Sequence, residues 1–368
     1  MSYQSIDTLQ KVLSETVFTH TKDAKKAAGR ALGTLIEIIT YYLLNEWKFS
    51  RSIAIERGIE EYGNSEITHN VEFSMHPIIS EENIYIEYDD KISVKKIAKK
   101  LDLGEDYKIK NNNLIEEHTI IKNACVVAEN SSHIVLAFLD NNNIEEHNIK
   151  IIHLLKQPFA MFECKRVGVE EGAKKGPQTI ENAKQGAYTA ITTSSLQKVR
   201  GERGEMLGLI YENGKPIIKP YFELLNEIVY QRKNIPENFI LSVGVVSNHG
   251  NWFTSDNPNK ELKVLAQSYD WLLFLSDSGL SQFISDLLLN PAEKYIPIQK
   301  AFYESYKEGK KCNIFTKVRM NLDAHIALTE YFHSNIQEIC NWFNIISPKN
   351  KTIDNLKNDL ISLIKKSC

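Results

Sequence analysis

The sequence predicts an α/β protein in which helices flank a mixed β-sheet. Segments with the apolar spacing of a helix alternate along the chain with short β-like runs. The order helix, strand, strand, inserted segment, strand, helix, strand is typical of an α/β fold with parallel and antiparallel neighbours. At 368 residues the chain is long enough for a large core and for about two domains.

The average composition is that of an ordinary globular protein. Hydrophobic residues make up 42% and charged residues 25% of the chain, which excludes a disordered tail, a coiled coil and a collagen-like fibre. No stretch stays apolar over the ~20 residues that span a bilayer. The 5 cysteines contain no CxxC pair, so we expect reduced thiols and a cytoplasmic protein.

The N-terminal part predicts one long helix and two strands. Apolar side chains recur three and four positions apart over residues 24–47, as they do on one face of a helix. Residues 52–59 and 69–78 are β-like runs, and Pro77 ends the second one.

Residues 80–157 differ in composition from the rest of the chain. This segment contains 14 acidic and 10 basic residues and two runs of three asparagines. Within it, residues 133–140 and 147–155 flank a polar turn as the strands of a hairpin do. We expect an inserted α+β module here.

Strand and helix patterns resume after the module. Residues 158–168 are strand-like, and a helix is expected over 177–196. We therefore assign residues 1–79 and 158–290 to one catalytic core, and residues 291–368 to a helical C-terminal region.

The strand that contains Glu163 and Lys165 carries the strongest chemical signal. Alternate side chains of a strand share a face, so these two point the same way and Cys164 points to the other face. A charged side chain at the end of an apolar strand costs free energy unless it is paired with another group or binds a ligand. Mg²⁺ would be such a ligand, because it binds carboxylate oxygens, and a lysine beside it can orient a water molecule.

A magnesium site needs a second acid from elsewhere in the chain. Glu72 is the first candidate, because the apolar neighbours Val71 and Phe73 set it on the opposite face of its strand. Asp140 is the alternative, at the end of an apolar run closer to Glu163 in the sequence. Glu37, on the first helix, is a third candidate acid.

Basic residues gather after the Glu163 strand, although the whole chain has a net charge of −3. Residues 163–203 contain 8 basic and 5 acidic side chains. A basic, glycine-containing loop that leads into a helix suits contact with phosphate groups. We therefore expect DNA contacts from Arg166, Lys174, Lys175 and Lys184, with Gln185 supporting the site.

These elements together resemble the catalytic core of the PD-(D/E)xK nucleases. The matching features are a helix with Glu37, a strand with Glu72, and Glu163-Cys164-Lys165 in the place of the ExK half of the motif. The segment FECKRVGVEEGAKKGPQTIENAKQGAY, over residues 162–188, is similar to the corresponding region of type II restriction endonucleases.

The resemblance implies a restriction endonuclease-like core and Mg²⁺-dependent hydrolysis of double-stranded DNA that leaves a 5′-phosphate. Glu163 would bind the metal ion and Lys165 would act as the water-orienting base. Glu72 would replace the usual aspartate and bind the metal as well. The Pro-Asp pair of the family is absent there, because the sequence reads His69-Asn70-Val71-Glu72.

Several partners follow from this hypothesis. A type II restriction enzyme acts beside a separate cognate DNA methyltransferase, and an enzyme that cuts both strands at a symmetric site is expected to be a homodimer. Two alternatives stay open: a structure-specific DNA repair nuclease with the same core, and a non-catalytic DNA-binding protein in which Glu163 and Lys165 form only an ion pair.

Overall fold

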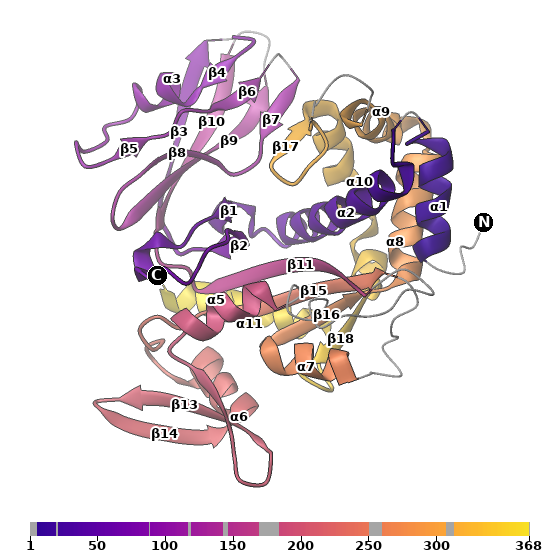
Figure 1. Cartoon of the computed structure of the whole chain (residues 1–368). Coiled ribbons are helices and arrows are strands. Elements are labelled where there is room, and N and C mark those ends of the chain that lie inside the picture. The colour runs from indigo at the N-terminus through magenta and orange to yellow at the C-terminus, as the bar shows by residue number, and fades with distance from the viewer. Residues whose placement is uncertain are drawn as a thin grey trace.

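The computed structural model describes residues 6–19, 21–87, 89–116, 119–142, 146–168, 184–249, 260–306 and 313–367. These residues form a mixed α/β protein with 10 α-helices and four sheets, one of them a six-stranded mixed sheet (Figure 1). Within the same ranges, no helix has both the length and the apolar character needed to cross a membrane.

The helices that the described residues form lie mostly in the N-terminal and C-terminal thirds of the chain. The α-helices are α1 (Ile6–Thr16), α2 (Ala24–Glu46), α3 (Val94–Ala98), α5 (Gln185–Thr193), α6 (Tyr221–Asn226), α7 (Lys260–Ser268), α8 (Asp277–Ile284), α9 (Ile296–Ser305), α10 (Leu322–Asn341) and α11 (Ile353–Ser367). Short 3-10 segments are η1 (Ser50–Ser52), η2 (Glu60–Tyr62) and η5 (Glu293–Tyr295), and π-helical segments are η3 (Glu227–Gln231) and η4 (Ser285–Leu289).

The six-stranded sheet lies at the centre of the molecule. Its order is β1 (Ile53–Arg57), β2 (Val71–Met75), β11 (Ala160–Gly168), β15 (Leu241–His249), β16 (Trp271–Leu275) and β18 (Phe343–Ser347). The pairs β11–β15 and β15–β16 are parallel, and the other three pairs are antiparallel. The strands expected over 52–59, 69–78 and 158–168 are thus neighbours in one sheet.

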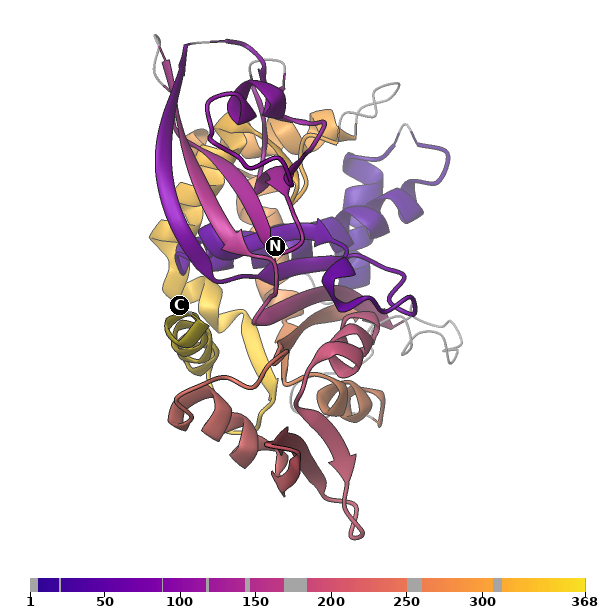
Figure 2. The ribbon, with the colours of Figure 1, turned by 90° about the vertical axis from the view of Figure 1, so that its left-hand side faces the viewer.

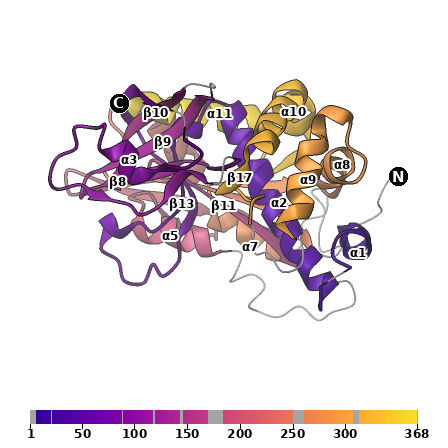
Figure 3. The ribbon, with the colours of Figure 1, turned by 90° about the horizontal axis from the view of Figure 1, so that it is seen from above.

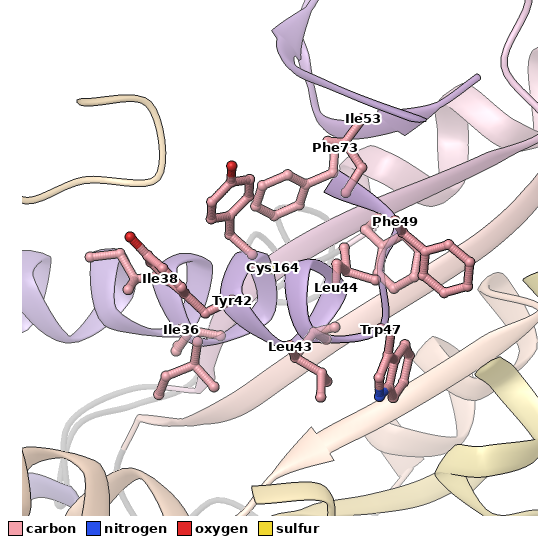
Figure 4. Packing of buried hydrophobic residues seen from close by; sticks show 14 of the residues in the cluster. Ile36, Ile38, Tyr42, Leu43, Leu44, Trp47, Phe49, Ile53, Phe73 and Cys164 are labelled. Carbon is pink, nitrogen blue, oxygen red and sulfur yellow. The ribbon is translucent and has the colours of Figure 1, made fainter. Parts of the chain in front are cut away.

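Helices cover both faces of this sheet. The expected helix over 24–47 is α2, which packs against β11 and is crossed by α10 (Figure 3). Its N-terminus is capped by the Asp23 carboxylate, which accepts the Lys26 N–H at 3.0 Å. Leu43 and Leu44 of α2 join the core cluster that also contains Phe73 of β2 (Figure 4). Helices α5 and α7 pack on the opposite face.

Residues 78–155 form a separate pair of sheets above β1 and β2 (Figures 1 and 2). One has the order β3 (Ile78–Glu87), β10 (Glu146–Leu155), β9 (His133–Asn142), β8 (Cys125–Glu129) and β5 (Lys108–Ile109). The other contains β7 (Ile120–Lys122), β6 (Asn113–Glu116) and β4 (Ile92–Ser93). The expected hairpin is confirmed, because β9 and β10 pair in antiparallel fashion. We call residues 78–155 the inserted module.

The remaining strands come from segments that the sequence patterns did not resolve. A three-stranded sheet of β12 (Gln197–Arg200), β13 (Met206–Glu212) and β14 (Lys215–Pro220) projects from the core (Figure 1). The C-terminal region contributes strands as well as helices: β18 extends the central sheet, and β17 (Arg319–Asn321) pairs with β7 of the inserted module. The expected helix over 177–196 is described only from residue 184, and α5 ends at Thr193.

Candidate active site

Three glutamates occupy one row across the central sheet. Glu56 of β1 lies opposite Glu72 of β2, and Glu72 is in line with Glu163 of β11. The pairs that fix this register are Ile55–Phe73, Arg57–Val71 and Phe162–Phe73. Regular pairing is interrupted at this row, because the β1–β2 pairing passes over Glu56 and Glu72 and the β2–β11 pairing ends at Phe73. Like charges that face each other across strands are unfavourable, so the row needs positive charge nearby.

Glu163 and Lys165 lie on one face of β11, as the alternation predicts. Lys165 Nζ is 2.9 Å from Glu163 Oε1, while the Cys164 thiol points to the other face and donates to Thr40 Oγ1 of α2. Burial by itself lowers the pKa of Lys165, but the charge and hydrogen bond of Glu163, together with the charge of Glu72, raise the pKa above its ordinary value. Lys165 therefore holds its proton at neutral pH. Its side chain is 30% exposed and Glu163 only 4%, so the ammonium faces solvent in front of the carboxylate.

Glu72 is held from two sides. Its Oε2 accepts the backbone N–H of Cys164 at 2.5 Å, and its Oε1 is 3.4 Å from Lys317 Nζ. Burial raises the pKa of Glu72 to about 8; the Lys317 ammonium opposes this, and the charges of Glu163 and Glu37 add to it. A further cation near Glu72 would therefore favour its ionised form.

Lys317 supplies a cation to this cluster. Its ammonium lies 3.1 Å from Glu37 Oε2 and 3.3 Å from Glu56 Oε1, besides its contact with Glu72. Burial lowers the pKa of Lys317, but the three carboxylates together raise it above its ordinary value. The candidate acid Glu37 therefore reaches the site through Lys317.

Glu163 and Glu72 are the two carboxylates that could hold a divalent cation at this site. In the described part of the chain, no three Asp, Glu, His or Cys side chains are grouped so that they could bind one metal ion. Glu163 Oε2, however, is buried and has no hydrogen-bond partner among the described residues. Mg²⁺ commonly binds to one or two carboxylates and completes its coordination with water and substrate phosphate. Glu163 and Glu72 fit this requirement.

Backbone strain marks the edge of the site. Glu56 has φ 50°, in the left-handed region that is unfavourable for a residue with a side chain. Such strain is found most often at functional sites, where the surrounding structure holds it in place. Here the strain turns the Glu56 carboxylate toward Lys317, with 55% of the side chain exposed.

Asp140, the alternative second acid, lies in a different part of the molecule. It belongs to β9 of the inserted module, where its Oδ2 accepts the Asn148 amide at 3.3 Å. The acids whose charges act on Glu72 are Glu163 and Glu37. The structure therefore places Glu72 on the strand next to that of Glu163, and Asp140 in a different sheet.

The expected DNA contacts have different positions. Arg166 is engaged within the chain: its guanidinium donates to the carbonyls of Asn248 and Gly29 and to Gln10 Oε1. Lys184 immediately precedes α5 and is half-buried. Lys174 and Lys175 lie outside the described residues, and so does the side chain of Gln185, the first residue of α5.

A polar cavity of about 310 Å³ adjoins the acidic row where β1 meets the inserted module. Glu56 and Val318, the residue after Lys317, are among its lining residues. The basic side chains in its wall are Arg57, Lys110, Lys122 and Lys156. Glu60 and Glu129 line the cavity as well, and Lys110 and Arg57 are paired with Glu129 and Glu61, so the wall beside the carboxylates carries mixed charge.

Sequence reasoning missed two residues of the site, Glu56 and Lys317. Glu56 follows an apolar run as an ordinary polar strand residue does, and only the register shows that it faces Glu72. Lys317 lies in the C-terminal region, and no local pattern distinguishes it from the other lysines there.

Comparisons with protein-family models, with curated proteins and with solved structures give no match to this chain.

Proposed function

We propose that the protein is a Mg²⁺-dependent endonuclease that hydrolyses phosphodiester bonds of double-stranded DNA at a specific sequence, as a type II restriction enzyme does. The observation that carries the proposal is the arrangement of Glu72, Glu163 and Lys165 on adjacent strands, with the lysine 2.9 Å from Glu163. Carboxylates that share a site with an ammonium are the groups that phosphodiester hydrolysis with a metal ion uses.

The order of the elements supports the same proposal. Helix α2, strands β1 and β2, strand β11, helix α5 and the parallel strand β15 occur in this order along the chain, with the inserted module between β2 and β11 and the sheet β12–β14 with α6 between α5 and β15. This is the order on which the resemblance to the PD-(D/E)xK core rests. We therefore propose a restriction endonuclease-like core for residues 1–79 and 158–290.

Each residue has a distinct task in the proposed reaction. Glu72 and Glu163 would hold Mg²⁺, which supplies positive charge for the scissile phosphate. Lys165, protonated and half-buried beside Glu163, would orient the attacking water by hydrogen bonding and face the phosphate. The water oxygen would join phosphorus as the P–O3′ bond breaks, the water would release one proton to solvent and the leaving 3′-oxygen would take one up from solvent, so the products carry a 5′-phosphate and a 3′-hydroxyl.

The proposed biological unit has partners of its own. Cutting both strands of a symmetric site calls for two catalytic centres related by a twofold axis, so we propose a homodimer. A restriction system also requires a separate cognate DNA methyltransferase that protects the host sequence. Light scattering of the purified protein, alone and with DNA, tests the dimer.

Cleavage of unmethylated phage DNA in Mg²⁺ tests the proposed activity. The wild-type protein should give discrete fragments with 5′-phosphate ends, and Lys165→Met should lower the cleavage rate by about 10²–10⁴-fold, the range for a group that transfers or positions a proton. Glu163→Gln should abolish cleavage while gel-shift binding in Ca²⁺ persists. Lys294→Met is the matched control, because Lys294 forms an exposed pair with Glu330 at 2.8 Å.

The pattern of products separates the alternatives. A ladder, or a preference for ends and flaps, would favour a structure-specific repair nuclease. Tight DNA binding without cleavage in Mg²⁺ or Mn²⁺ would favour a non-catalytic DNA-binding protein. Cleavage at the wild-type rate by Glu163→Gln would contradict every version of the proposal that uses this site.

A further inference from the structure

The ammonium group of Lys317 contacts three acids that do not contact Lys165 directly. Lys317 Nζ lies within 3.4 Å of one carboxylate oxygen each from Glu37 of α2, Glu56 of β1 and Glu72 of β2. The Lys317 side chain is only 4% exposed. A buried ammonium with three carboxylate partners is fixed in position, and it fixes its partners in return.

The position of Lys317 is set by the inserted module. The side-chain amide of Asn123 donates to the Lys317 carbonyl at 3.0 Å, and the Asn123 backbone N–H donates to the Val318 carbonyl at 2.8 Å. Asn123 directly follows β7. Strand β7 pairs with β17, which begins at Arg319, shortly after Lys317. The hydrogen bonds of Asn123 and the pairing of β7 with β17 therefore hold Lys317 over the central sheet, although Asn123 and Lys317 are far apart in the sequence.

Glu72 depends on this arrangement more than its neighbours do. Glu37 is anchored in the middle of a long helix, and Glu56 is half exposed to water. Glu72 is buried, stands where the β2–β11 ladder has ended, and has only the Cys164 N–H as its other polar contact among the described residues. Without Lys317, Glu72 Oε1 would lose the ammonium that holds it beside Glu37 and Glu56, and the Glu72 side chain would keep only its contact with the Cys164 N–H among the described residues.

We propose that Lys317 is a positioning residue for Glu72, and that the inserted module serves the active site by holding Lys317 in place. This inference rests on the proposed nuclease function, since it assigns Glu72 a place beside Glu163 where both can bind the metal ion. The chemistry at the phosphate remains with Lys165. The module thus contributes to catalysis through Asn123 and β7 without touching the reacting atoms.

Three variants separate charge, size and anchoring. Lys317→Met removes the charge but keeps the length of the side chain, Lys317→Arg keeps the charge, and Asn123→Ala removes one anchoring hydrogen bond. Lys294→Met serves as the control for loss of an ion pair at the surface. Each protein is assayed for DNA cleavage, giving kcat and KM, and for hydrogen exchange of the Cys164 amide in the metal-free state.

The proposal predicts a specific pattern. Lys317→Met should lower kcat by about 10–100-fold, as loss of a group that orients a metal ligand does, with little change in KM for DNA. Lys317→Arg should recover most of the activity, and Asn123→Ala should lose about tenfold. The Cys164 amide should exchange faster in Lys317→Met, because Glu72 no longer holds it, and at the wild-type rate in the control.

Several outcomes would overturn the inference. Wild-type kcat and unchanged Cys164 exchange in Lys317→Met would show that Glu72 does not need Lys317. Faster cleavage by Lys317→Met would show that the ammonium competes with the metal ion for the site. If Lys317→Met does not fold, Lys317→Arg and Asn123→Ala carry the test, and wild-type kcat in Asn123→Ala would then count against the proposal.

Failure of the inference can be told apart from failure of the proposed function. If the wild type cleaves DNA, Glu163→Gln does not, and Lys317→Met does, only the role of Lys317 is wrong. If the wild type cleaves no DNA in any metal ion, the nuclease proposal itself is wrong.

Discussion

The backbone N–H of Cys164 donates to the Glu72 carboxylate, although the strands that carry these residues have stopped pairing at that point. A side chain thus continues the hydrogen bonding that the backbone of β2 no longer supplies. The bond sets Glu72 beside Glu163, the residue before Cys164, and leaves Glu72 Oε1 for Lys317. This geometry underlies the first of four predictions about stability.

Glu72 makes the stability of the metal-free protein depend on pH. Burial raises the pKa of Glu72 from its ordinary value of 4.5 to about 8. Between these values the native state binds more protons than the unfolded state, so stability falls as pH rises. Glu72→Gln, which cannot ionise, should lose less stability than the wild type over this range. Thermal melts with a chelator present measure the difference, and Glu60→Gln, an exposed acid of η2, is the control.

His76 should have the opposite dependence on pH. Its Nδ1–H donates to the Leu155 carbonyl and its Nε2 accepts the Ser74 hydroxyl. Burial, with the charge of Arg57, lowers the pKa of His76 from 6.5 to about 3. Below pH 6.5 the His76 side chain is protonated in the unfolded chain but stays neutral in the native state. Stability is therefore lost as pH falls from 6.5 toward about 3. Urea unfolding should show a shallower acid loss in His76→Gln; an equal slope in both proteins would argue against this account.

Asp270 connects three structural elements and should matter for stability. Its carboxylate accepts from the backbone N–H of Ser242 at 2.7 Å, from the Ser242 hydroxyl at 2.9 Å and from Tyr221, and it lies 3.3 Å from Lys198 Nζ. Asp270→Ala would leave a largely buried ammonium unpaired, which costs about 3–5 kcal/mol. Urea titration beside Asp102→Ala, an exposed acid, gives the comparison. A loss below about 1 kcal/mol would be ordinary for a surface substitution and would contradict the assignment.

Gly244 of β15 is the strand partner of Glu163, and the space left by its missing side chain is filled by the Tyr269 ring. A Cβ atom at Gly244 would lie 2.8 Å from the Tyr269 ring and 3.0 Å from Leu272, which is closer than carbon atoms pack. Gly244→Ala should therefore cost about 1–3 kcal/mol, as overpacking of a core does. Gly33→Ala is the matched control, since nothing lies within 4 Å of its Cβ position and α2 should gain about 0.5–1 kcal/mol. Chemical denaturation should give opposite signs for the two variants.

The local parts of the fold could be predicted from the sequence. The apolar spacing over 24–47 gave α2 to within one residue, and the alternation around Cys164 placed Glu163 and Lys165 on one face. Both rest on periodicities that a helix or strand imposes on its own residues. The short helix α1 was not predicted, and the sequence alone does not assign β16, because an apolar run of five residues fits a strand and a buried helix alike.

The candidate site required information that no single segment contains. Glu56, Glu72 and Glu163 form a row only because three strands adopt one register, and register depends on the whole sheet. Lys317 reaches the row through β17, whose partner strand lies in the inserted module. Asp140 was a reasonable alternative on sequence distance, but its strand belongs to a different sheet.

The two ends of the inserted module meet. Ile78 pairs with Leu154, and the Leu155 N–H donates to the Pro77 carbonyl at 3.0 Å. The chain therefore leaves and re-enters the central sheet at neighbouring positions, as it does at a hairpin turn. Residues within the module can be substituted or inserted without moving β2 or β11. In the course of evolution such a unit can be exchanged or enlarged while the sheet stays the same. Asn123 and β7 restrict such changes, because any replacement module must still bind the backbone at Lys317 and pair with β17.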